Sequence, residues 1–231
     1  KLDLHHIPAL SNVLYSEDIL FPIADFYLKK ERWNEAIEVY EEMETIGALQ
    51  GRGAEYYQKL GYALQKNKKY AEAIDAYLKA DTLKPDNIWN NRHLAICYRL
   101  NRNYQAALSY YKKVEEATPE DTNVIFHIGS CLAELGQYEE AANYFFKLDF
   151  IESNCIKAWR GIGWCSFISR KYEQAMKYYE KIIEQKPLAI DYMNAGHVAW
   201  TMGDIQKAAA LYGKSITANG NRERFLEMFR K

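Results

Sequence analysis

The sequence predicts an all-α protein built from about six copies of a 34-residue helix–turn–helix unit. Two unrelated residue types share this period. Among the prolines, Pro85 and Pro119 lie one period apart, and Pro187 lies two periods after Pro119. Three of the four cysteines recur once per period, namely Cys97, Cys131 and Cys165. A fixed period of this length is typical of repeat architectures in which each unit is one supersecondary element.

Alignment on this period gives each copy a small residue, an alanine twelve positions later and an aromatic four positions after that. The small residues are Gly61, Ala95, Gly129, Gly163 and Gly196. The alanines are Ala73, Ala107, Ala141, Ala175 and Ala208, and the aromatics are Tyr77, Tyr111, Phe145, Tyr179 and Tyr212. An earlier copy keeps the frame with Ala24, Ala36 and Tyr40. Apolar residues recur at helical spacing in both halves of each copy, so we expect two antiparallel amphipathic helices that approach closely at the small residues.

Composition excludes several classes of protein. Hydrophobic residues make up 48% and charged residues 26% of the 231-residue chain, which is too apolar for a disordered protein. The formal net charge of −1 supplies no overall field toward nucleic acid or an anionic membrane. No apolar run reaches the roughly 18 residues that a membrane span requires. We therefore expect neither a nucleic-acid partner nor membrane insertion.

The repeated residues resemble the tetratricopeptide repeat (TPR) family. The best-fitting copy, residues 54–87, carries Tyr57, Leu60, Gly61, Ala73, Tyr77, Ala80 and Pro85. The copy at 156–189 carries Trp159, Ile162, Gly163, Ala175, Tyr179 and Pro187. Two departures are Asn91 at the first aromatic position and Ser153 at the proline position. The resemblance implies a right-handed superhelical solenoid of about six repeats, at 17–50, 54–87, 88–121, 122–155, 156–189 and 189–222.

Both ends of the repeat array are predicted to be capped, because a solenoid needs a polar outer face at each terminus. Residues 1–16 are interpreted as a capping helix or as the end of an upstream repeat. Residues 222–231 are interpreted as a short C-terminal capping helix. An insertion at Gln50–Gly53 predicts a wider turn after the first copy. The chain begins with Lys1 rather than Met, so it is expected to be processed or part of a longer protein.

The sequence offers no pattern for catalysis, a metal or a cofactor. Cys97, Cys131 and Cys165 occupy one repeat position, and neighbouring repeats hold that position too far apart for one tetrahedral zinc, so we interpret them as core residues. Cys155 is predicted to be a free surface thiol in a turn. Unpaired thiols favour a reducing compartment, and we expect a cytoplasmic location. The histidines form no motif for catalysis or metal binding.

The resemblance also implies that the first helices of the repeats line a concave groove. The groove is acidic and polar at its N-terminal end, with Asp18, Asp25, Glu55 and Gln58. The predicted binding residues are Tyr62, Trp89, Arg92, His93, Ile96, Arg99, Phe126, His127, Lys157, Arg160, Trp164, Phe167, His197 and Trp200. Aromatic rings interleaved with arginine are typical of binding hot spots. We expect the groove to bind an extended or helical peptide with apolar anchors and some acidic character. The alternative interpretation is that the rings pack between adjacent helices and that the arginines pair with neighbouring carboxylates.

The leading hypothesis for function is a protein–protein interaction scaffold or adaptor without catalysis. One alternative is a self-assembling module that forms a homo-oligomer. Another is a regulatory or sensor domain of a larger protein. RNA recognition by a helical-repeat code is disfavoured by the charge balance.

Overall fold

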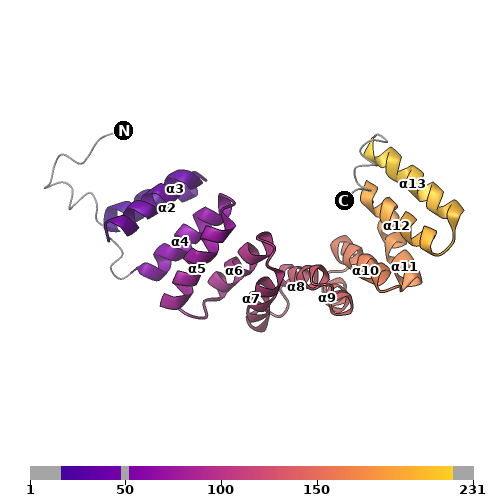
Figure 1. The fold of residues 1–231 in the computed structure, drawn as a ribbon, viewed down its shortest axis with the longest axis horizontal. Coiled ribbons are helices and arrows are strands. Elements are labelled where there is room, and N and C mark those ends of the chain that lie inside the picture. Colours follow the sequence, from indigo (N-terminus) through magenta and orange to yellow (C-terminus); the bar gives the residue numbers. More distant parts are fainter. Residues whose placement is uncertain (1–16, 48–51, 221–231) are drawn as a thin grey trace. The chain divides into compact units, whose positions relative to one another are not determined.

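The computed structural model describes residues 17–47 and 52–220, which fall into two compact units with their boundary between Ala117 and Thr118 (Figure 1). Unit 1 contains three helix pairs: α2 (Glu17–Lys29) with α3 (Trp33–Thr45), α4 (Gly53–Lys66) with α5 (Tyr70–Leu83), and α6 (Ile88–Leu100) with α7 (Tyr104–Ala117). Unit 2 contains three more: α8 (Thr122–Glu134) with α9 (Tyr138–Ile151), α10 (Ile156–Ile168) with α11 (Tyr172–Ile183), and α12 (Ala189–Thr201) with α13 (Ile205–Asn219). No strand occurs in the described ranges, so the all-α prediction is confirmed.

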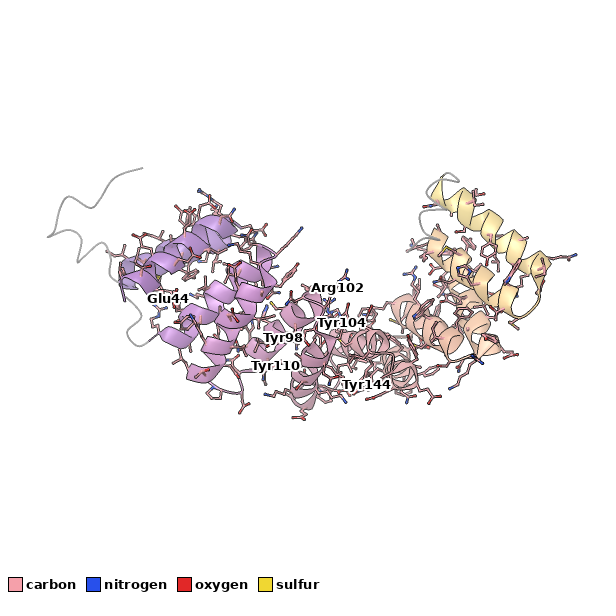
Figure 2. The ribbon with its side chains drawn as sticks, viewed as in Figure 1. Glu44, Tyr98, Arg102, Tyr104, Tyr110 and Tyr144 are labelled. Carbon is pink, nitrogen blue, oxygen red and sulfur yellow. The ribbon has the colours of Figure 1, made fainter. Side chains whose placement is uncertain are left out.

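The core of each unit lies between successive helices, where the repeated alanines and aromatics are buried. In unit 1 the fully buried rings include Tyr40, Tyr56 and Tyr77. At the C-terminal edge of this unit, Tyr98 of α6 stacks on Tyr110 of α7 with ring centroids 5.6 Å apart (Figure 2). Each ring therefore stabilises contact between two helices rather than within one helix.

The repeated glycines let the two helices of a pair approach at a specific ring. A Cβ atom added to Gly61 would lie 2.8 Å from the ring of Tyr77. The equivalent atom on Gly196 would lie 2.6 Å from the ring of Tyr212. Both distances are shorter than a normal carbon–carbon contact, so the missing side chain is what makes room for the ring.

Every turn between the two helices of a pair contains one residue with left-handed backbone. These residues are Glu31, Lys68, Arg102, Gly136, Arg170 and Gly203, with φ between 56° and 84°. The next residue closes the first helix with a hydrogen bond to the carbonyl five positions earlier; Asn103 N–H donates to Tyr98 at 2.9 Å. This geometry is the Schellman motif, which satisfies carbonyls that a helix end leaves without partners. Arg102 lies at one such turn in Figure 2.

The cysteines form part of the core. Cys97, Cys131 and Cys165 are at most 1% exposed, as expected from their shared repeat position. Burial raises the pKa of Cys97 to about 12 and that of Cys165 to about 11, which keeps both as unreactive thiols. The prediction for Cys155 was wrong, because this residue is also buried. It packs with Ile125, Leu148 and Ala158 immediately before α10, since the turn that carries it folds back onto the core of unit 2.

The predicted terminal caps at 1–16 and 222–231 lie outside the described residues, as does most of the insertion at Gln50–Gly53. The second helices of the first five pairs begin at Trp33, Tyr70, Tyr104, Tyr138 and Tyr172. The interval between the first two of these starts is longer than the three later intervals, which are equal. An insertion after the first copy accounts for this difference. The repeat boundaries themselves remain predictions.

Candidate functional site

Unit 1 carries a cluster of five rings that come from the first helices α4 and α6 and from the second helices α3 and α5. We call it the aromatic cluster, and it consists of Trp33, Tyr62, Tyr77, Trp89 and His93. Trp89 lies 4.0 Å from His93, and Tyr62 lies within 6.3 Å of Trp33, Trp89 and His93, all measured between ring centroids. Tyr77 is fully buried, but Trp89 remains 42% exposed. The cluster therefore has a buried base and an exposed rim.

His93 is held as a neutral ring inside this cluster. Its Nδ1 lies 2.8 Å from Oε1 of Gln65, which also accepts from the hydroxyl of Tyr77 at 3.0 Å. Because an amide oxygen only accepts, Nδ1 of His93 carries the donated proton. Burial, assisted by the nearby charges of Arg92 and Lys66, lowers the pKa of His93 to about 4.

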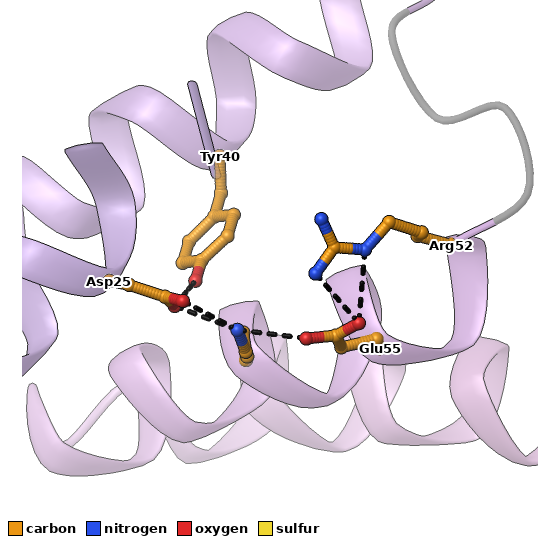
Figure 3. A network of polar contacts seen from close by, with 5 residues as sticks. Asp25, Tyr40, Arg52 and Glu55 are labelled. Atoms are coloured by element: carbon orange, nitrogen blue, oxygen red, sulfur yellow. Dashed lines mark hydrogen bonds and ion pairs between the residues drawn. The ribbon is translucent and has the colours of Figure 1, made fainter. Parts of the chain in front are cut away.

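The N-terminal end of unit 1 contains a balanced network of charges (Figure 3). Lys59 donates to Asp25 at 2.8 Å and pairs with Glu55 at 2.9 Å. Arg52 bonds the other side of Glu55 at 3.0 Å, and the Tyr40 hydroxyl donates to Asp25 at 3.5 Å. Hydrogen bonding to Lys59 is the main reason that the pKa of Glu55 is lowered. Asp25 and Glu55, which the sequence suggested as part of an acidic groove end, are thus bound to cations.

Unit 2 contains an open hollow with a volume of about 630 Å³. We call it the unit 2 hollow, and it is lined by Phe126, Ser130, Ala133, Glu134, Tyr138, Phe145, Lys157, Arg160, Gly161, Trp164 and Asn194. These residues come from the first helices α8, α10 and α12 and from α9. Four predicted binding residues meet here, namely Phe126, Lys157, Arg160 and Trp164. Trp164 is 43% exposed, so its ring is available to a bound molecule.

Both cations of the unit 2 hollow are bound by carboxylates of the same unit. Arg160 makes two hydrogen bonds to the fully buried Asp191, at 2.8 and 2.7 Å. Lys157 pairs with Glu152 at 3.3 Å and lies over the ring of Phe126. The alternative interpretation, in which arginines pair with neighbouring carboxylates, therefore describes Arg160 correctly.

Gly161 lines the unit 2 hollow and makes room for the ring of Phe145. A Cβ atom on this residue would lie 2.5 Å from the ring of Phe145, which occupies the space beside it. The preceding repeats place His93 and His127 at this position of the first helix. The absence of a side chain here lets the buried ring of Phe145 pack against α10, with its centroid 6.0 Å from that of Phe126.

The other predicted residues do not line the unit 2 hollow, although His127 contacts Phe126 with ring centroids 5.4 Å apart. His197 contacts the hydroxyl of Tyr212 at 2.9 Å, and burial lowers its pKa. Phe167 packs against Trp164 and Tyr172, whereas Trp200 is 59% exposed.

No cluster of three or more histidine, cysteine or carboxylate side chains within the described ranges could hold a metal ion. Among these residues, no helix is both long and apolar enough to cross a membrane.

Three family models described as tetratricopeptide repeat match most of the length of the chain. One matches residues 99–165, a second matches 54–87, 156–187 and 192–222, and a third matches 20–50. The chain belongs to the tetratricopeptide repeat family. Comparison with curated proteins gives no match.

Solved TPR structures share this fold. The structure described as "MamA MSR-1 C2" is 26% identical, covers 74% of this chain and 94% of its own, and gives a TM-score of 0.64. MamA 41-end from Desulfovibrio magneticus RS-1 is 18% identical, covers 74% and 97%, and gives 0.66. YrrB, described as a TPR protein with an unusual peptide-binding site, is 20% identical, covers 80% and 97%, and also gives 0.66.

Several residues that shape the two TPR sites were absent from the sequence-based set. Trp33 joins the aromatic cluster from the start of a second helix, which the expected groove positions do not include. Asp191 was missed because its role depends on Arg160, which belongs to the preceding repeat. The glycine at 161 was detectable, since the aligned repeats place larger side chains at that position.

Proposed function

We propose that this chain is a protein-interaction scaffold that binds a segment of a partner protein in the unit 2 hollow. The observation that carries the proposal is the exposed Trp164, which lines a preformed hollow together with Phe126. A large exposed ring next to a preformed hollow is typical of the few residues that supply most binding energy. No catalytic step is assigned to the chain.

The chemistry of the unit 2 hollow favours an apolar anchor. Asp191 and Glu152 already bind the two cations, so a carboxylate on the ligand would have to compete with them. Phe126 and Trp164 offer ring surfaces instead. The sequence predicted a peptide with both apolar anchors and acidic character. For this unit we propose only the apolar part, so that the ligand inserts a large apolar or aromatic side chain into the hollow.

Membership in the TPR family supports an interaction role. YrrB, which has a similar fold, is described as having a peptide-binding site. A reducing, cytoplasmic location remains part of the proposal, supported by four cysteines that form no disulfide.

Two experiments test the proposal. A random peptide display library is first selected on the full chain. The affinities of the selected peptides are then measured for two variants. We expect Trp164→Ala to weaken the selected peptides by about tenfold or more, as for a hot-spot tryptophan. Trp200→Ala is the matched control, because Trp200 is also exposed but does not line the hollow. Equal loss in both variants, or a selection that enriches no peptide, would contradict the proposal.

Self-association is a second candidate that one observation favours. Trp200, Met202 and Ile205 are 59%, 44% and 52% exposed at the turn between α12 and α13. Neighbouring exposed apolar side chains of this kind often mark protein contacts. Sedimentation across a concentration series distinguishes the two functions, because self-association raises the mass without added peptide and Trp200→Ala should abolish that rise.

A further inference from the structure

Unit 1 presents a second surface whose charge differs from that of the unit 2 hollow. Along α6, Trp89, Arg92, Ile96 and Arg99 follow one another at three- and four-residue intervals, so they share one face of the helix. Lys66 of α4 joins this face, because its ammonium lies 5.3 Å from the ring centroid of Tyr62 in the aromatic cluster. We call the aromatic cluster together with Lys66, Arg92 and Arg99 the cationic aromatic face.

Two of these cations have no carboxylate within ion-pair distance among the described residues. Lys66 is exposed and lies over the Tyr62 ring, and Arg99 donates to the Tyr111 hydroxyl at 3.4 Å. By contrast, the Lys59, Lys157 and Arg160 side chains are each paired with a carboxylate. Lys66 and Arg99 therefore keep a positive charge that no carboxylate among the described residues neutralises, unlike these other three cations.

Arg92 and Lys66 lie near His93 at the centre of the face, where their charges add to the lowering of its pKa by burial. Beside these charges, the exposed rim of Trp89 offers apolar surface for a side chain. A ligand that matches both features carries negative charge next to an apolar group.

We infer that the cationic aromatic face binds an acidic segment of a partner protein, in which carboxylates flank an aromatic or large apolar side chain. The apolar side chain packs on Trp89 and Tyr62, and the carboxylates meet Lys66 and Arg99. This surface lies wholly in unit 1, so it is independent of the hollow on which the proposed function rests.

The same geometry argues against single-stranded nucleic acid. Bases bind by stacking on open ring faces along a groove of many cations. Here Trp89 lies 4.0 Å from His93, and Tyr77 stacks on His93 at an interplanar angle of 28°, so each of these two rings already has a ring neighbour on one side. The formal net charge of −1 also gives the chain little general attraction for phosphates.

Fluorescence anisotropy with the full chain tests the inference. The probes are a labelled peptide of alternating Glu and Phe, its counterpart with Gln for Glu, and a labelled oligouridylate. We expect the Glu peptide to bind at least about tenfold more tightly than the Gln peptide, and its affinity to fall as salt is raised. The double variant Lys66→Gln, Arg99→Gln should remove this preference.

Lys113→Gln is the matched control, because Lys113 is an exposed lysine of α7 that lies over the ring of Tyr110. It should bind the Glu peptide as the unchanged chain does. A thermal melt of each variant separates lost binding from lost folding. Equal affinity for the two peptides, equal binding by the double variant, or tighter binding of the oligouridylate would each overturn the inference. Trp164→Ala should leave binding of the Glu peptide unchanged. The proposal for the unit 2 hollow and the inference for this face can therefore be disproved separately.

Discussion

Arg160 and Asp191 are joined by two hydrogen bonds of 2.8 and 2.7 Å, and this pair links α10 to the start of α12. Asp191 is fully buried and also accepts the backbone N–H of Leu188 at 2.7 Å. Asp191 thus closes the N-terminus of its own helix while it fixes a groove arginine of the preceding repeat. Arg160 is therefore a poor choice for a charge-reversal test of binding, because its replacement would also disturb the fold.

Arg160→Met should lower the free energy of unfolding by about 2 kcal/mol, because it leaves a buried carboxylate without its cation. The value is below that for a fully buried pair because the Arg160 side chain is 36% exposed. Urea denaturation measures the change. The double variant Arg160→Met, Asp191→Asn should regain part of the loss, and unchanged stability of the single variant would show that the pair is not structural.

Stability of unit 1 should decrease as the pH falls from about 6.5 toward about 4. His93 has a folded pKa below its unfolded pKa, so the unfolded chain binds the proton first. Its neutral form therefore stabilises the fold fully above the unfolded pKa, and this contribution is lost on acidification. We expect a loss of about 2–3 kcal/mol over this range. Urea midpoints of the unchanged chain and of His93→Gln, measured across this pH range, check it; a parallel pH dependence in both would contradict it.

Replacing a left-handed turn residue with glycine should stabilise the chain. Arg102 and Arg170 each have φ of 60°, a conformation that costs a residue with a side chain about 1–2 kcal/mol. The greater freedom of glycine in the unfolded chain offsets part of this gain, so we expect about 0.5–1 kcal/mol from Arg102→Gly. Gly136→Arg makes the opposite change at the equivalent turn and should lower the melting temperature. A lower melting temperature for Arg102→Gly would be inconsistent with strain at this turn.

Two glycines of the last repeat should respond in opposite directions to alanine. A Cβ on Gly196 would lie 2.6 Å from the Tyr212 ring, so Gly196→Ala should destabilise by about 1–3 kcal/mol through overpacking. A Cβ on Gly213 meets nothing within 4 Å, and alanine favours a helix by about 0.5–1 kcal/mol over glycine. Thermal denaturation of the two variants gives the comparison, and equal shifts would refute a specific role for the Gly196–Tyr212 contact.

Sequence by itself determined the class of fold, the helix pairs and most of the core. These features follow from local spacing, because every repeat buries the same face against its neighbour and so must repeat the same residue types. The shared period of the cysteines identified Cys97, Cys131 and Cys165 as core residues for this reason. It could not identify Cys155 as buried, because that residue lies in a turn where no helical pattern applies.

Only the tertiary structure decided which groove charges are neutralised. Arg92 and Arg160 share one position of the aligned repeats, and Arg99 holds another predicted groove position. The structure gives Arg160 a buried carboxylate from the following repeat and gives Arg99 none among the described residues. Charge pairing depends on distances between side chains of different repeats, and a repeating pattern does not encode those distances. The fold could therefore be derived from the sequence, whereas the contrast between a hollow whose cations are paired and a cationic face required the coordinates.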